Sequence, residues 1–161
     1  MAINALFSAD DVILGLSATS KRQLFEILAA EVSRHGGPAE EEALEALTAR
    51  EKLGSTGLGK GVGLPHAELK SASRPVMLFA RLEEAIDFDA QDDEPVDLIF
   101  LVLWPESSNK EFLTTISTLC GVLRDPKTLK RLRKAETAEE IVGIVHEECQ
   151  PESKSDEQGQ Q

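Results

Sequence analysis

The chain has 161 residues, which is enough for one domain with a buried core. Its formal net charge of −12 excludes general binding to nucleic acid or to acidic membranes, and two distant cysteines outside any C-x-x-C pattern exclude a disulfide framework and a zinc site. Because the N-terminus has no basic stretch before its apolar residues and no apolar run could span a bilayer, we expect a cytoplasmic protein.

Helical spacing of apolar residues predicts two helices in the first third of the chain. The first covers about residues 20–35, and Gly36 is its expected left-handed cap. Pro38 is expected to open the second at its first helical position. That second helix ends before Gly54.

The middle of the chain predicts strands. Val76, Leu78, Ala80 and Leu82 recur at every second position after Pro75, 86–90 form a short second candidate, and 95–105 ("PVDLIFLVLWP") fit a central strand buried on both faces. Three helices are expected after residue 108, and the tail from 150 to 161 is expected to be disordered. We therefore predict a single α/β domain over residues 1–149, an α/β/α sandwich whose mixed central sheet is flanked by helices.

Between these parts lies the glycine-rich stretch Gly54–His66, "GSTGLGKGVGLPH". It matches the G-x-x-x-x-G-K pattern of a phosphate-binding loop, but Gly61 stands where that loop needs a hydroxyl residue for Mg²⁺. A helix precedes it in place of a strand, and Pro65 follows it where a helix interior would be required. A nucleotide-binding enzyme is therefore the weaker interpretation, and we expect no metal and no cofactor.

The alternation of Gly59, Gly61 and Gly63 with larger residues instead predicts a strand with one bare face, as found where a backbone or ligand approaches closely. Pro65 then ends the strand and presents His66. Residue types alone leave open whether His66 is functional or an ordinary surface histidine.

The stretch Ala49–Leu69, "AREKLGSTGLGKGVGLPHAEL", resembles the active-site segment of the mannitol/fructose-type enzyme IIA domains of the bacterial phosphoenolpyruvate-dependent phosphotransferase system. Within that family, the chain looks most like the stand-alone nitrogen-regulatory IIA proteins. "PVDLIFLVLWP" and "FLTTISTLCGVLRD" extend the resemblance to about residues 5–148.

The resemblance implies a phosphotransferase component that carries a phosphoryl group on Nε2 of His66, received from an HPr-type phosphohistidine carrier. Arg50 would bind the phosphoryl oxygens. Ser55, Thr56 and Gly57 would support them with hydroxyl and backbone N–H donors. Composition adds the hypothesis that the donor docks on an apolar patch formed by Leu58, Leu64 and Phe112, with an acidic rim that suits a basic partner. Many relatives have a second histidine where this chain has Phe112, which also fits its helix as a first core residue.

The resemblance also implies the partners. A regulatory carrier would act on sensor kinases or potassium-transport proteins, and the lack of an attached IIB or IIC segment favours this function. The alternative is a sugar-specific IIA that passes its phosphoryl group to the cysteine of a separate IIB. A binding module that works without phosphorylation also remains open.

Overall fold

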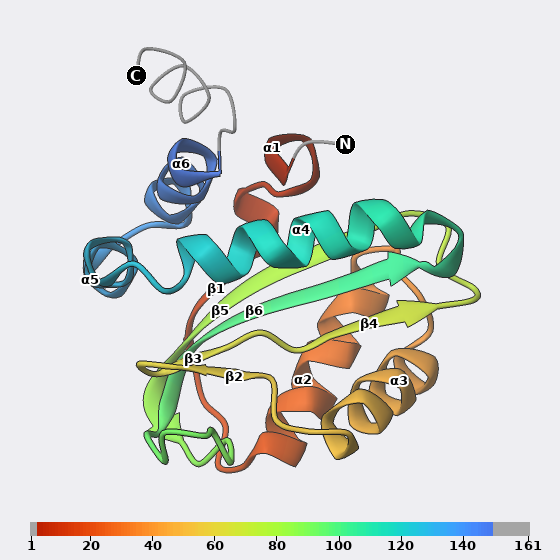
Figure 1. The fold of residues 1–161 in the computed structure, drawn as a ribbon, viewed down its shortest axis with the longest axis horizontal. Coiled ribbons are helices and arrows are strands. Elements are labelled where there is room, and N and C mark those ends of the chain that lie inside the picture. Colours follow the sequence, from red (N-terminus) through yellow and green to blue (C-terminus); the bar gives the residue numbers. More distant parts are fainter. Residues whose placement is uncertain (1–2, 150–161) are drawn as a thin grey trace.

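The strand Val96–Pro105 (β6) is the one around which the sheet is built. In the computed structural model, which describes residues 3–149, β6 pairs antiparallel with Val76–Ile86 (β5) on one side. On its other side it pairs in parallel with both Val62–Gly63 (β3) and His66–Leu69 (β4). Val12–Leu16 (β1) lies parallel to β5, and Gly57–Gly59 (β2) lies antiparallel to β3. The predicted mixed sheet is confirmed, with the order β1-β5-β6-β3-β2 (Figure 1).

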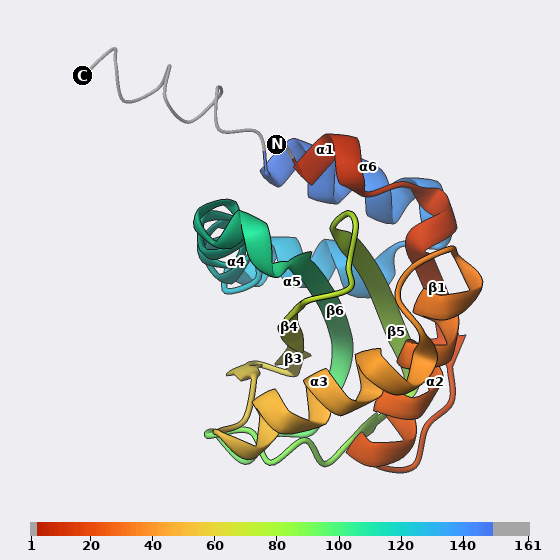
Figure 2. The same cartoon turned by 90° about the vertical axis from the view of Figure 1, so that its right-hand side faces the viewer.

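Helices cover both faces of this sheet (Figure 2). One face carries Ile3–Leu6 (α1), Asn109–Val122 (α4), Pro126–Lys134 (α5) and Ala138–Glu148 (α6). The other carries Lys21–Arg34 (α2) and Glu40–Lys52 (α3). Short 3-10 turns at Ala9–Asp11 and Glu106–Ser108 complete the described chain.

Each face has its own apolar core, and β6 contributes to both. Every residue of β6 except Asp97 is buried, and its side chains alternate between the two cores. The prediction of a central strand buried on both faces is confirmed. Because β4 pairs only with β6, the strand that begins with His66 lies at an edge of the sheet.

Helix boundaries follow the sequence signals with one correction. Gly36 has φ +79° directly after α2, as expected of a left-handed cap. Pro38, in contrast, lies before α3, whose N-cap is Ala39 with an extended ψ of 143°. The first turn of α3 is instead formed by Glu40, Glu41 and Glu42, whose carboxylates suit the positive end of the helix dipole.

The strands differ from expectation in two places. β1 was not predicted, because Gly15 at φ +74° and a register shift between Leu14 and Leu16 interrupt its short apolar pattern. The expected separate strand at 86–90 is wrong. Ile86 is the last residue of β5, and the chain then turns where Asp87 Oδ1 accepts a hydrogen bond from the N–H of Asp89 at 3.0 Å. The predicted disorder of residues 150–161 lies outside the described residues.

Candidate functional site

The glycine-rich segment is a hairpin, so the prediction of one continuous strand through residues 59–64 is wrong. β2 and β3 pair antiparallel, and the chain reverses at Lys60 and Gly61. Gly59, Lys60 and Gly61 have φ values of 92°, 58° and 83°, in the region where glycine carries no steric penalty. The alternating glycines therefore belong to a tight turn between two short strands. Glycines in such a turn can have the same two-residue spacing as glycines on the bare face of one strand.

Gly63 of the predicted alternation is closely approached, but by a side chain in place of a backbone or ligand, and Gly57, outside that alternation, is closely approached as well. A Cβ added to Gly57 would lie 2.9 Å from Cβ of Ala90, and one added to Gly63 would lie 3.0 Å from the Phe88 ring. The hairpin therefore packs directly on the segment that follows β5. This packing fixes the chain that leads into Pro65 and His66.

His66 is the first residue of β4, and its imidazole is half-buried. Its Nδ1 lies 2.7 Å from the carbonyl oxygen of Leu64. Because a carbonyl can only accept, this contact places a proton on Nδ1, and the neutral ring then has its lone pair on Nε2. Burial lowers the pKa of His66 from its ordinary value, and the Arg50 charge lowers it further, against opposing effects of the Leu64 hydrogen bond and Glu51.

Phe112 lies beside this imidazole. It sits in the first turn of α4, its ring centroid is 5.9 Å from that of His66, and its other neighbour is Trp104 at 6.1 Å. The two interpretations of Phe112 are therefore compatible: it is a buried core residue, and it also occupies a position next to His66.

Arg50 belongs to the last turn of α3, and its Nη1 donates to the carbonyl oxygen of Gly54 at 2.9 Å. After burial, the positive charge of Arg50 is a further cause that lowers the pKa of His66. Within residues 3–149, no carboxylate lies within ion-pair distance of Arg50. The guanidinium is thus held by the Gly54 carbonyl and has no neutralising partner among residues 3–149.

The predicted support residues have partners already. Ser55 Oγ donates to the carbonyl oxygen of Phe88 and accepts from the N–H of Gly57, both at 3.1 Å. Thr56 donates its hydroxyl to Oε1 of Glu51 at 2.7 Å and its N–H to Oε2 at 3.1 Å. These bonds fix the loop between α3 and β2. A direct role of Ser55, Thr56 and Gly57 toward a phosphoryl group remains a prediction.

Sequence reasoning missed Glu51 and Lys21. The Glu51 side chain is only 8% exposed, accepts both Thr56 bonds and pairs with Lys21 Nζ at 2.8 Å. A signal was present, since Glu51 directly follows Arg50 and stands five residues before Thr56. Nothing in the sequence near Lys21 connects it to this loop, because that contact is between α2 and the end of α3.

The predicted docking patch needs correction. Leu64 is 1% exposed and lies in the core under α4, so it offers no surface to a partner. Phe112 is also buried, and only Leu58 is half-exposed. Leu113 at 61% exposure and Leu53 are the large apolar side chains that do reach the surface.

Residues 3–149 form neither a candidate metal cluster nor a membrane-spanning helix. No cluster of three or more histidine, cysteine, aspartate or glutamate side chains could hold a metal ion. Among the same residues, no helix combines the length and hydrophobicity that a membrane crossing requires.

Residues 5–148 match the family model described as phosphoenolpyruvate-dependent sugar phosphotransferase system, EIIA 2. The chain belongs to this family. It is 37% identical to a nitrogen regulatory protein of Bradyrhizobium diazoefficiens over 145 residues, which cover 90% of this chain and 95% of the relative. It is 38% identical to a fructose-specific EIIA component of Haloferax volcanii over 105 residues, covering 65% and 68%.

The crystal structure of nitrogen regulatory protein IIA-Ntr from Neisseria meningitidis has the same fold. Its TM-score is 0.85 at 35% identity, covering 89% of this chain and 98% of that one. The chain is therefore a IIA protein of the phosphotransferase system, similar to nitrogen regulatory proteins, and the family is a phosphotransferase component.

Proposed function

We propose that this IIA protein accepts a phosphoryl group on Nε2 of His66 from an HPr-type phosphohistidine carrier and regulates its targets according to phosphorylation state. The observation that carries the proposal is the 2.7 Å contact between His66 Nδ1 and the Leu64 carbonyl. It supports the proposal because the ring that donates from Nδ1 to this carbonyl keeps its lone pair on Nε2, which can then act as the nucleophile.

In the transfer, the P–N bond of the donor breaks as the Nε2 lone pair of His66 forms the new P–N bond. The lowered pKa of His66 supports this step, because it keeps the imidazole neutral at pH 7. Negative charge on the transferring group is spread over its equatorial oxygens, and the Arg50 guanidinium is available to stabilise it. The donor phosphohistidine is already reactive, so the step needs no nucleotide.

The regulatory part of the proposal is supported by the similarity to nitrogen regulatory proteins across nearly the whole chain. A phosphoryl group on the half-buried His66 adds negative charge at an edge of the sheet, which can create or block a protein interface. Sensor kinases and potassium-transport proteins are the proposed targets.

Intact-protein mass spectrometry after incubation with phosphoenolpyruvate, enzyme I and an HPr-type carrier tests the carrier function. We expect one acid-labile phosphoryl adduct on the wild type and none on His66→Ala. His35→Ala and His146→Ala are matched controls from other elements, and both should keep the adduct. An unmodified wild type, with donors proven on another IIA protein, would contradict the proposal.

The 38% identity to a fructose-specific EIIA component favours a second candidate, a sugar-specific IIA. In that case, the phosphorylated protein would pass its group to the cysteine of a IIB protein. Incubating the purified phosphorylated protein with a fructose-type IIB separates the two functions. A regulatory carrier should retain its phosphoryl group over the time in which a sugar-specific IIA loses it.

A further inference from the structure

A cleft between α2 and α3 lies outside the chemistry described so far. Its volume is about 420 Å³, within the range of small-molecule sites. Phe25 and Leu44 supply its apolar part, and Lys21, Arg22 and Lys52 supply three cations. In a chain with a net charge of −12, three cations around one apolar hollow favour an anionic ligand.

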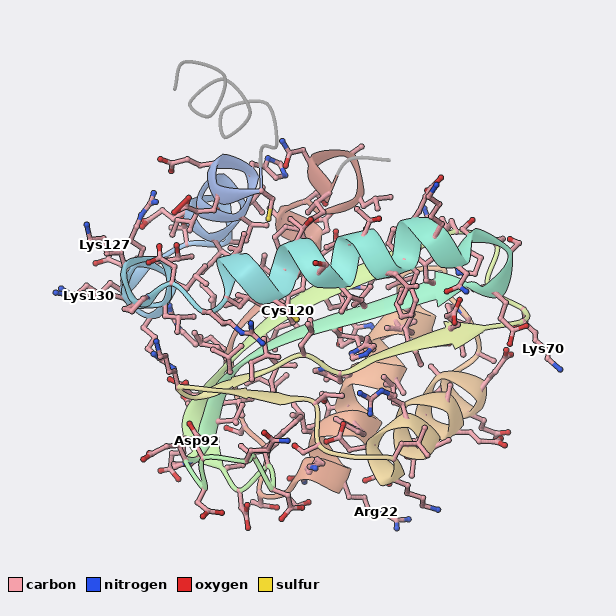
Figure 3. All side chains as sticks on the ribbon, in the orientation of Figure 1. Arg22, Lys70, Asp92, Cys120, Lys127 and Lys130 are labelled. Atoms are coloured by element: carbon pink, nitrogen blue, oxygen red, sulfur yellow. The ribbon has the colours of Figure 1, made fainter. Side chains whose placement is uncertain are left out.

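The three cations differ in how they are held. Lys21 Nζ lies 2.8 Å from Oε2 of the largely buried Glu51, 3.7 Å from Oδ2 of the exposed Asp89 and 4.6 Å from the centroid of the Phe88 ring. Arg22 is exposed and projects from α2 into solvent (Figure 3), with Glu26 only at 4.0 Å. Lys52 is exposed and has no carboxylate within ion-pair distance among residues 3–149. The cleft therefore has one cation in a fixed position, Lys21, and two exposed cations that can change conformation, Arg22 and Lys52.

Glu51 connects this cleft to the phosphoryl site. It lines the cleft, pairs there with Lys21, and accepts both hydrogen bonds of Thr56 on the loop that leads to the hairpin. The negative charge of Glu51 also raises the pKa of His66, although burial lowers this pKa by more. The Glu51 carboxylate thus contacts both the α2–α3 cleft and the loop that leads to the His66 site.

We propose that the α2–α3 cleft binds a small organic anion with an apolar body, such as an aryl or branched carboxylate or phosphonate, and that Glu51 couples this binding to His66. The anionic group pairs with Lys21, Arg22 and Lys52, and the apolar body covers Phe25 and Leu44. An anion that takes Lys21 competes with Glu51 for its ammonium group. The negative charge of Glu51 then acts more strongly on the phosphoryl site.

The sign of the coupling follows. A phosphoryl group on His66 adds negative charge near Glu51, whose own charge acts on His66, so it strengthens the attraction between Glu51 and the Lys21 ammonium group. The phosphorylated protein should therefore bind the anion more weakly, and by reciprocity the anion should disfavour phosphorylation. This regulatory half rests on the proposed carrier function, whereas the binding half does not.

Binding is tested with phenylphosphonate in a ¹H–¹⁵N NMR titration of the unphosphorylated protein. We expect saturable shifts at Phe25, Leu44 and Thr48. Inorganic phosphate lacks the apolar body and benzyl alcohol lacks the charge, so each should bind at least about threefold more weakly. Arg22→Ala and Lys52→Ala should weaken phenylphosphonate binding by a similar factor.

Lys70→Ala is the matched control, because it removes one exposed cation at the distant end of the molecule (Figure 3). Equal weakening by Lys70→Ala would reduce the effect to net charge and overturn the proposed site. Shifts that stay linear at the cleft residues up to about 10 mM ligand would overturn it as well.

The coupling has its own readout, the ring signals of unphosphorylated His66. Phenylphosphonate should shift them in the wild type and leave them unchanged in Glu51→Gln, which keeps an acceptor for Thr56 but loses the charge. Cleft binding without any response of His66 in the wild type would overturn the coupling. Since none of these measurements uses phosphorylation, a failure of the carrier function would be seen separately.

Discussion

Glu51 and Thr56 are joined by two hydrogen bonds, so that a helix end and a strand entry share one carboxylate. Oε1 accepts the Thr56 hydroxyl at 2.7 Å and Oε2 accepts its N–H at 3.1 Å. Glu51 follows Arg50 in α3, and the carbonyl of Thr56 accepts the N–H of Leu64, whose own carbonyl contacts His66. The pair therefore fixes the two chain segments that carry Arg50 and His66 relative to one another.

Replacing Glu51 by alanine should lower the free energy of unfolding by about 2–4 kcal/mol. Thr56 is only 4% exposed, so its hydroxyl and N–H would lose a charged acceptor inside the protein. Glu45→Ala, on an exposed position of the same helix, should stay within about 0.5 kcal/mol of the wild type. Urea denaturation measures both, and equal losses in the two variants would show that Glu51 has no special role.

Gly57→Ala should destabilise the protein, by about 1–3 kcal/mol, because the added methyl group meets Cβ of Ala90 at 2.9 Å and its Cα at 3.2 Å. Gly143→Ala in α6 has no atom within 4 Å of the added methyl and should be stabilising by about 0.5–1 kcal/mol. Thermal and urea unfolding of the two variants should move in opposite directions. A neutral Gly57→Ala would mean that the hairpin can shift away from Ala90.

Features that depend on neighbouring residues in the chain could be predicted from the sequence. The nearly continuous apolar run between two prolines at residues 95–105 predicted the central strand, which the structure confirms. The resemblance of the glycine-rich segment made His66 the candidate site residue, and its role stays a prediction. The predictions failed for features that depend on contacts between residues far apart in the chain. β1 forms because it can pair with β5, and Leu64 is buried because α4 and the sheet enclose it.

The Lys21–Glu51 pair shows the same limit within the site. It joins two helices 30 residues apart in sequence, and no local pattern encodes that contact. Likewise, one spacing of glycines is compatible with a bare strand face and with a hairpin turn. In the structure, Lys60 has a positive φ, which a lysine rarely adopts. This φ identifies the glycine segment as a hairpin turn and not as one strand.

The pKa of His66 should lie below its ordinary value of 6.5, because burial opposes the second proton. The unfolded chain then binds more protons than the folded one at pH values between the two pKa values. Stability should therefore fall as pH falls from 6.5 through the folded pKa, and this dependence should be absent from His66→Gln.

NMR titration of the His66 ring protons measures this pKa directly. Urea denaturation of the wild type and His66→Gln over the same pH range measures the linked stability. A ring titration midpoint at or above 6.5 would contradict the prediction. Phosphoryl acceptance should decline in the same pH window, since protonation removes the Nε2 lone pair.

Phe112→His would place a second imidazole beside His66, since the ring centroids of Phe112 and His66 are 5.9 Å apart. The new N–H can donate to a phosphoryl oxygen on His66 and should slow loss of the phosphoryl group by about 2- to 10-fold. The same change buries a polar ring against Trp104 and should lower stability by about 1–3 kcal/mol. The half-life of the phosphorylated protein at pH 7, followed by mass spectrometry, measures the first effect.

Leu113→His is the matched control for this experiment. It introduces the same imidazole one residue later, on a side chain that is 61% exposed in the same helix. Its half-life should equal that of the wild type, and its stability should stay within about 0.5 kcal/mol. If both variants prolonged the phosphorylated state equally, the effect would come from added imidazole charge in general. A selective effect of Phe112→His would establish that the loss of a second imidazole at this position makes the phosphoryl group of this protein shorter-lived.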